Sequence, residues 1–249
     1  MKKIDIIVPF YNAKEHILQV FENNLSHLIM DKKIENFRII LVNDGSSNKD
    51  YLPHIERYKG LFCDNFLFVD LPQNKGKGGA IKEGVKHSNA DIVAFYDIDF
   101  PFGINALYNL YEVLQNDETD VVISIRDSSY IKKLPFKRKI ISQFVKTVSY
   151  ILSKGKIRDS QAGLKGMKYS VAPILIETKS NSFIMDFEFL LKVVSIKALP
   201  DKEKAELRNI IVAQSNSIQE SLEKSSESDR SGKLASIVKN NRVNVQWEG

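Results

Sequence analysis

Two aspartates, Asp97 and Asp99, stand one residue apart directly after the apolar run IVAFY (92–96). In an extended chain both side chains would point to the same side and lie close together. Two unpaired carboxylates held that close would repel each other or take up a proton. A divalent cation removes this cost, and Mg²⁺ or Mn²⁺ held by one or two carboxylates keeps positions open for phosphate oxygens. The spacing therefore predicts a metal site at Asp97 and Asp99; the alternative is two solvated acids at the start of a loop.

A glycine-rich stretch, NKGKGGAIKEG (74–84), leads into a predicted helix. Such a stretch presents backbone N–H groups and a helix dipole to phosphate, and Lys77 adds a point charge. It is not a dinucleotide-binding fingerprint, because Ile81 stands where the third glycine is needed, and it is not a Walker loop, because no Gly-Lys-Ser/Thr follows. A further acid, Asp44 in VNDGSS (42–47), is either a ligand or ordinary turn chemistry.

Alternating strands and helices would position these side chains. Apolar runs rich in β-branched and aromatic residues predict strands, and apolar residues at helical spacing predict the helices between them. Strict alternation is typical of a parallel sheet with helices on its faces, in which ligands bind beyond the carboxyl ends of the strands. Three of the first four predicted strands end in an acid: Asp44, Asp70 and Asp97. The predicted strands are 4–10, 37–44, 65–71, 91–97, 120–126 and 242–249, and the predicted helices are 14–29, 79–88, 104–114 and 139–152.

The composition argues against several classes of protein. The lone Cys63 rules out an internal disulfide framework and fits a reducing compartment, and the four scattered histidines do not predict a zinc site. A net charge of +5 is mild, so no nucleic-acid partner is expected. No apolar run reaches the roughly 18 residues of a membrane span, and the run before Pro9 is too short for a signal peptide.

Three motifs, in this order and spacing, resemble the family-2 glycosyltransferases with the GT-A fold. They are VPFYN (8–12), VNDGS (42–46) and NKGKGGAIKEGVKHSNADIVAFYDID (74–99). The resemblance implies an α/β protein with a mostly parallel central sheet flanked by helices. It further implies one catalytic domain over residues 1–249, with a nucleotide-sugar-binding half (1–100) and an acceptor-binding half (101–249) that carries a polar insertion at about 197–232.

The resemblance also implies roles for individual residues. Asp99 would ligate a Mg²⁺ or Mn²⁺ that bridges the donor diphosphate, and Asp97 would contact the ribose or the metal. That cation would neutralise charge on the leaving nucleoside diphosphate. Three features depart from the family pattern. Ala13 stands where an acid is common, and Glu15 either replaces that acid or does not. Phe100 and Pro101 stand where many relatives have a hydrophobic residue and a metal-ligating glutamine, and about forty polar residues stand where relatives have a short loop before the last strand. The nucleotide-sugar would be bound by Pro9, Tyr11, Asn12, Asp44, Lys77, Gly78 and Asp97.

Two later motifs, RDSQAGLKGM (158–167) and FIMDFEFLLKV (183–193), resemble the dolichyl- and polyprenyl-phosphate glycosyltransferases. The resemblance implies that Arg126, Arg138 and Ser142 receive the lipid phosphate. It places Asp159, Gln161 and Glu188 in the sugar and acceptor pocket, with Gly163 beside them, and makes Asp186 catalytic together with Asp97 and Asp99.

A basic segment, 131–156, lies within a stretch (128–158) that has nine Lys or Arg and no acid. Its apolar stripe beside cationic residues is typical of a helix at an anionic membrane surface. The alternative is a core-packing helix with a solvated basic edge. The expected location is therefore cytoplasmic and peripheral, at the inner face of the membrane, and a longer native protein would carry membrane segments absent from this chain.

These features predict a metal-dependent inverting enzyme that moves a hexose from UDP-glucose or GDP-mannose to a polyprenyl or dolichyl phosphate. One alternative is transfer to a saccharide or glycoconjugate hydroxyl, with Asp186 or Glu188 as general base. Another is a nucleotide-sugar-binding module without catalysis. The insertion at 197–232 is a candidate contact for a homo-oligomer or a partner.

Overall fold

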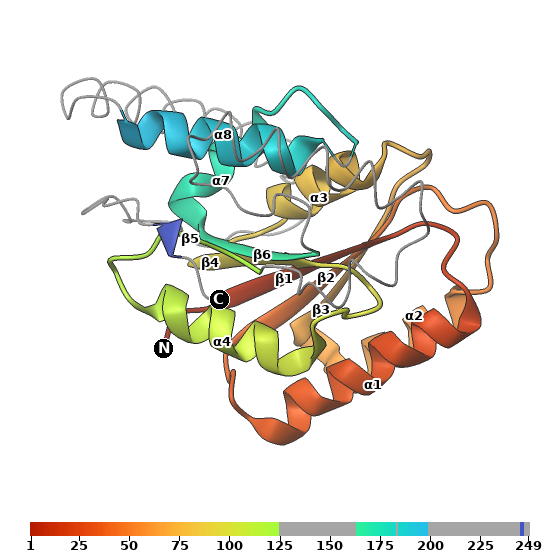
Figure 1. Cartoon of the computed structure of the whole chain (residues 1–249). Coiled ribbons are helices and arrows are strands. Elements are labelled where there is room, and N and C mark those ends of the chain that lie inside the picture. The colour runs from red at the N-terminus through yellow and green to blue at the C-terminus, as the bar shows by residue number, and fades with distance from the viewer. Residues whose placement is uncertain (125–162, 183, 199–244, 247–249) are drawn as a thin grey trace, which may run out of the picture.

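The structure, a computed structural model, describes residues 1–124, 163–182, 184–198 and 245–246. Seven strands lie in these ranges: β1 (Ile4–Phe10), β2 (Phe37–Asn43), β3 (Phe66–Asp70), β4 (Ile92–Tyr96), β5 (Val121–Ile123), β6 (Leu164–Lys168) and β7 (Val245–Gln246). They form one sheet with the order β3-β2-β1-β4-β6-β5-β7 (Figure 1). The strands β1 to β4 pair in parallel with one another, β6 runs antiparallel to both β4 and β5, and β7 is parallel to β5.

Helices cover both faces of this sheet. On one face lie α1 (Glu15–Asp31), α2 (Leu52–Phe62) and α4 (Gly103–Gln115), and on the other lie α3 (Lys77–Lys86), α7 (Ala172–Ile176) and α8 (Met185–Ala198) (Figure 1). Two short 3₁₀ helices, η1 (Cys63–Asn65) and η2 (Tyr169–Val171), complete the described elements. The strand period of two explains the division, because Ile6 and Val8 pack with the first set of helices and Ile7 with the second.

The predicted α/β class and mostly parallel sheet are confirmed, and the first four strands and the helices at 14–29 and 104–114 are found within a few residues of their predicted bounds. The glycine-rich helix begins earlier than predicted, at Lys77. The parallel pairing ends at β4, because its other neighbour, β6, runs antiparallel to it. Three elements, α2, α7 and β6, were not predicted from the sequence. In β6 a lysine and a glycine interrupt the apolar pattern, yet Lys165 and Gly166 are both buried.

The topology brings the ends of distant segments to one edge. The strands β1 to β4 are parallel where they pair, so their carboxyl ends lie on the same side. The antiparallel β6 begins at that edge beside β4, and the N–H of Asp97 donates to the carbonyl of Gly163 at 3.0 Å. Each acid that follows one of these strands is therefore near the others, as the alternating pattern predicts.

A buried ion pair fixes α8 to the sheet. Lys165 on β6 is fully buried, and its Nζ donates to Oδ2 of Asp186, in the first turn of α8, at 3.1 Å. The Lys165 ammonium also lies 5.4 Å from the ring centroid of Phe95 on β4. Burial lowers the pKa of Lys165, and the carboxylate of Asp186 opposes that shift. Among the described residues, Lys165 is the cation that pairs with Asp186, and a carboxylate left unpaired in this environment is strongly disfavoured.

We predict that Lys165→Met destabilises the protein by about 3–5 kcal/mol, because the charge of Asp186 is left buried without its partner. The double variant Lys165→Met/Asp186→Asn should recover much of this loss. Denaturant unfolding measures both values. Lys192→Met is the matched control. Lys192 lies on α8, the helix of Asp186, and forms a partly exposed ion pair with Glu188 at 3.4 Å. Its substitution should cost about 1 kcal/mol or less. Equal costs at positions 165 and 192, or no recovery in the double variant, would contradict the assignment.

Candidate active site

The acidic pair lies in a tight turn rather than in an extended segment, which corrects the geometry inferred from the sequence. The N–H of Phe100 donates to the carbonyl of Asp97 at 3.0 Å, and Phe100 has a positive φ of 46°. The two carboxylates are nevertheless close enough to interact. Burial, and next the negative charge of Asp97, raise the pKa of Asp99. The predicted repulsion between the acids is therefore present, although its geometrical cause is different.

Aromatic packing holds this turn in place. The side chain of Phe100 is buried, with its ring centroid 4.3 Å from that of Tyr96 and 6.1 Å from that of Phe21 on α1. The hydroxyl of Tyr96 accepts from the N–H of Phe102 at 3.1 Å and donates to the carbonyl of Gly103 at 2.9 Å. A left-handed phenylalanine is disfavoured, so these contacts must stabilise the turn that carries Asp99.

A positive charge lies against the acidic pair, and it belongs to the protein. Lys77, at the start of α3, forms an ion pair through Nζ with Oδ1 of Asp97. Burial would lower the pKa of Lys77, but the charges of Asp97 and then Asp186 outweigh it, and the pKa is raised. The prediction that Lys77 lies near the nucleotide site is consistent with this position, although its described partner is a carboxylate.

The glycines of residues 74–84 allow close packing within the protein, and the predicted role of this stretch in binding phosphate stays a prediction. A Cβ at Gly76 would lie 2.6 Å from the carbonyl oxygen of Asn181, and one at Gly78 would lie 2.8 Å from Cβ of Met185. The N–H of Gly79 donates to the carbonyl of Asn181 at 3.2 Å, so it is not presented to phosphate. These glycines let the loop before α8 approach α3 closely, which a larger residue would prevent.

Lys82 completes the contact between α3 and this loop. Its Nζ donates to the carbonyls of Thr178 at 2.5 Å and Ser180 at 2.9 Å, and to Oδ1 of Asn181 at 3.0 Å. Burial lowers the pKa of Lys82, which is opposed by the charge of Glu188. Lys82 was not among the predicted site residues. A lysine on the otherwise apolar and glycine-rich face of a helix is the signal that would have indicated it.

Glu188 holds the same loop from its other side. Its Oε1 and Oε2 accept from the N–H of Lys179 at 2.8 and 3.0 Å, and Oε2 also accepts from the N–H of Ser180 at 3.0 Å. Burial would raise the pKa of Glu188, but these two N–H groups and Lys192 outweigh it and lower the pKa. In the described structure this carboxylate therefore organises the loop before α8, and its assignment to the sugar and acceptor pocket stays a prediction.

Four of the seven predicted nucleotide-binding residues lie near the ends of β1 and β2. Pro9 is buried within β1 opposite Val42, whereas Tyr11 is 52% exposed beyond the end of that strand. Asn12 has a positive φ of 47°, and its Oδ1 accepts from the N–H of Ser47 at 2.9 Å. The buried carboxylate of Asp44 accepts from the N–H of Lys75 at 2.7 Å and so joins this edge to the glycine-rich loop.

A buried network that the sequence analysis missed supports the same edge. Nδ2 of Asn43, the last residue of β2, donates to Oδ1 of Asp70 at 2.6 Å and to the hydroxyl of Tyr51 at 3.0 Å. Oδ1 of Asn43 accepts from the hydroxyl of Ser46 at 2.5 Å, and the hydroxyl of Tyr51 also accepts from Nζ of Lys49 at 3.0 Å. Glu15, the considered substitute for the missing acid, instead contacts His54 at 3.0 Å.

The chemistry of the acidic turn fits a divalent cation. Among the described residues, no three His, Cys, Asp or Glu side chains gather into a ready-made metal site. Asp97 and Asp99 would thus supply carboxylate oxygens, and donor phosphates and water the remaining ligands, as is usual for Mg²⁺ or Mn²⁺. The raised pKa of Asp99 supports this fit, because a cation beside both acids relieves the penalty for ionising the pair.

Several predicted residues lie outside the described ranges. They are Arg126, Arg138, Ser142, Asp159 and Gln161, together with the basic segment 131–156 and most of the insertion at 197–232. The helix α8 continues to Ala198, at the beginning of that insertion. Of the helices that the structure describes, none has both the length and the hydropathy to cross a bilayer.

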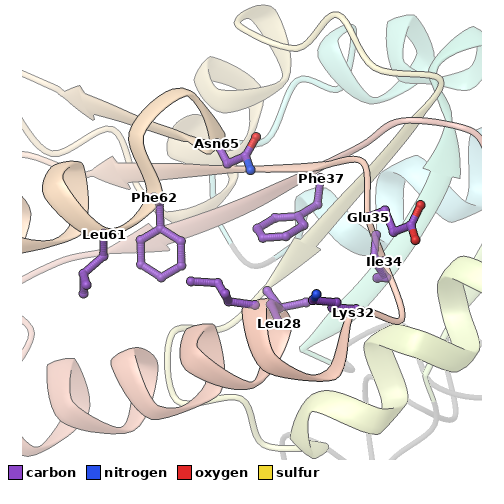
Figure 2. Close-up of a pocket in the computed structure, with 9 residues that line it drawn as sticks. Leu28, Lys32, Ile34, Glu35, Phe37, Leu61, Phe62 and Asn65 are labelled. Carbon is purple, nitrogen blue, oxygen red and sulfur yellow. The ribbon is translucent and has the colours of Figure 1, made fainter.

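A hollow of about 320 Å³ lies away from the acids, where β2 and β3 begin. Figure 2 shows Phe37 and Phe62 at this hollow, with Lys32 and Glu35 nearby. Ligands of such sheets bind beyond the carboxyl ends of the strands, so this hollow is not the expected donor site. Its full lining is Leu28, Ile29, Lys32, Ile34, Glu35, Phe37, Leu61, Phe62 and Asn65.

Similar proteins of known sequence include several transferases. A dolichyl-phosphate beta-glucosyltransferase from Trichomonas vaginalis is 28% identical over 178 residues, which cover 65% of this chain and 52% of that protein. A UDP-N-acetylglucosamine–dolichyl-phosphate N-acetylglucosaminyltransferase from Methanococcus voltae is 26% identical, with 71% and 73% covered. The chain thus spans about half the length of the first relative and 73% of the second.

Solved structures and a family profile complete the comparison. Glucosyl-3-phosphoglycerate synthase from Mycobacterium tuberculosis, solved with Mn²⁺, UDP and phosphoglyceric acid, is 15% identical with a TM-score of 0.55, and 87% of this chain and 78% of that one are covered. This likeness concerns the fold. The profile described as "Glycosyl transferase family 2" matches residues 5–175, more than half of the chain. The chain therefore belongs to glycosyl transferase family 2 and has the GT-A fold.

Proposed function

We propose that this chain catalyses the transfer of a hexose from a nucleotide-sugar to a polyprenyl or dolichyl phosphate, with the help of a divalent cation. The observation that carries the proposal is the acidic turn of Asp97 and Asp99, which lies at the carboxyl edge of the parallel strands beside Lys77. The family membership and the names of the two dolichyl-phosphate relatives support it.

In this proposal the donor diphosphate lies beside the acidic turn. Asp97 and Asp99 would hold Mg²⁺ or Mn²⁺, which when bound stabilises the negative charge that develops on the leaving diphosphate. The buried ring of Phe100 and the hydroxyl of Tyr96 keep the turn in one conformation, so little reorganisation is needed during transfer. Tyr11 and Asp44, at the ends of β1 and β2, are the proposed contacts for the base and ribose.

The acceptor chemistry explains why no general base is needed. A phosphate monoester, with a second pKa of about 6, is mostly dianionic at neutral pH. Its oxygen attacks the anomeric carbon while the bond from that carbon to the diphosphate oxygen breaks, and the configuration inverts. The acceptor therefore requires positioning and charge screening. Arg126, Arg138 and Ser142 are proposed for this from their sequence positions, with the segment 131–156 at the membrane surface.

Among donors, a UDP-sugar of the glucose type is favoured over GDP-mannose. The support comes from the relatives, whose names specify a glucosyltransferase and a transferase that uses UDP-N-acetylglucosamine. A beta-glucosyl product also agrees with inversion at the anomeric carbon of an α-linked donor. Comparison of UDP and GDP as ligands of the chain would distinguish the two donor classes.

A second candidate is transfer to a hydroxyl group, with Asp186 as general base. One observation favours it: Oδ1 of Asp186 is buried and accepts no hydrogen bond from the described residues. The other oxygen accepts from Lys165, which supports a structural role instead. We place this candidate second because a base must reach the acceptor proton, and Asp186 is only 5% exposed.

We predict that Asp99→Asn weakens the binding of UDP in the presence of Mn²⁺ at least tenfold, because the cation loses one carboxylate ligand. With a chelator present, the wild type and the variant should bind UDP equally. Isothermal titration calorimetry measures both affinities. Asp64→Asn, at an exposed acid in η1, is the control for loss of one negative charge. Unchanged UDP affinity of Asp99→Asn with Mn²⁺ would exclude the proposed cation site.

We predict that Asp186→Asn retains transfer to a lipid phosphate within about tenfold of the wild type. A general base contributes about 10²–10⁴-fold to a rate, so the loss would be far larger if Asp186 removed a proton from a hydroxyl acceptor. The measurement is transfer of radiolabelled hexose to a short polyprenyl phosphate and, separately, to a saccharide. UDP binding of the variant serves as the folding control. A hundredfold loss on lipid phosphate would favour a catalytic Asp186.

We predict that Glu188→Gln lowers the free energy of unfolding by about 1 kcal/mol at pH 7, because the N–H groups of Lys179 and Ser180 lose a charged acceptor. The pKa of Glu188 is lowered in the folded state, so its stabilisation is present at neutral pH and is lost as the pH falls through that lowered value. The difference between wild type and variant should therefore shrink in acid. A difference that is constant from pH 7 to pH 3 would contradict this role.

A further inference from the structure

We propose that Lys77 and the divalent cation compete for Asp97, so that the ammonium of Lys77 leaves this carboxylate when the cation and the donor bind and then faces the donor diphosphate. This inference rests on the proposed function and assigns Lys77 a role within it. The lysine would act as a counter-charge that stabilises the acidic turn before the donor arrives, and as a diphosphate contact afterwards.

The position of Asp97 is the first argument. Its Oδ1 is paired with Nζ of Lys77, and its Oδ2 lies against Gly163, so closely that a Cβ at that glycine would collide with it. Both oxygens therefore already have a neighbour. A cation held by Asp97 and Asp99 would lie beside the ammonium that already pairs with Oδ1 of Asp97, and two positive groups repel each other at so short a separation.

The charge of the surrounding cluster is the second argument. Among the residues that the structure describes, Lys77 and Lys165 interact with three aspartates, Asp97, Asp99 and Asp186, so these five charges sum to one negative charge. A divalent cation added to this cluster makes it positive, and a donor diphosphate restores the balance. Movement of the ammonium from a carboxylate to the diphosphate keeps each positive charge beside a negative one throughout.

The side chain of Lys77 is free to move, whereas its helix is not. This side chain is 36% exposed, and its ammonium is carried on a flexible four-carbon stem. The backbone beneath it is held by Gly79 and Lys82, which bind Asn181 and its neighbours. Lys165 offers the opposite case, since it is completely buried with Asp186 and has no space for such an exchange. Lys77 is therefore the exchangeable cation of the cluster.

The test is the affinity for Mn²⁺ alone, followed by the electron paramagnetic resonance signal of the free ion, in the 249-residue chain. Lys77→Met should bind Mn²⁺ at least threefold more tightly than the wild type, because a competitor has been removed. At saturating Mn²⁺ the same variant should bind UDP at least threefold more weakly, because the diphosphate contact of the displaced ammonium has been lost. Lys75→Met is the matched control: Lys75 lies two residues away but pairs with Glu83 at 3.4 Å, and neither affinity should change.

The outcomes separate this inference from the proposed function. Unchanged or weaker Mn²⁺ binding by Lys77→Met, with wild-type binding intact, overturns the exchange and leaves the metal-dependent transferase standing. Equal tightening in Lys75→Met also overturns it, because the effect would then be general electrostatics. A wild-type chain that binds no Mn²⁺, even with UDP, overturns both. Lys77→Gln repeats the comparison with a polar side chain, so that an effect of the methionine on folding is recognised.

Discussion

The carboxylate of Asp97 is the point on which the carboxyl edge of this sheet depends. Three segments that are distant in the sequence meet there: α3 through the ammonium of Lys77, β4 through Asp97 itself, and β6 through Gly163. The N–H of Asp97 donates to the carbonyl of Gly163, and its carboxylate pairs with Lys77. The end of β4 and the position of this carboxylate are therefore fixed together. The proposed cation site needs negative charge at this place, and the fold supplies that charge with a counter-charge already beside it.

Two ion pairs of the same composition have opposite physical properties here. Lys165 and Asp186 have side chains 0% and 7% exposed, so removal of one partner leaves an unsolvated charge and the pair is permanent. Lys77 and Asp97 are 36% and 34% exposed, so either charge can be solvated or can change partner at small cost. The first pair therefore fixes α8 to the sheet, whereas the second is suited to a site that must bind and release a charged donor.

The sequence was sufficient for the parallel half of the fold and for the acids at its edge. Buried strands give continuous apolar runs, and strands paired in parallel bring Asp44, Asp70 and Asp97 to one side whatever the details of the loops. The antiparallel β6 could not be predicted in this way, because Lys165 and Gly166 break its apolar pattern. The burial of Lys165 depends on Asp186, 21 residues later, and a local pattern does not contain that partner.

The glycine-rich stretch shows why a site is harder to predict than a strand. A glycine in the sequence indicates that another group approaches the backbone closely, but it does not show whether that group is a phosphate or another segment of the chain. Here Asn181 and Met185 approach Gly76 and Gly78, so packing within the chain already requires small residues at these two positions. The consequence is favourable for the proposed chemistry. The first turn of α3 and the first turn of α8 are held by shared contacts, so packing rather than flexible loops sets the spacing between the exchangeable ion pair and the permanent one.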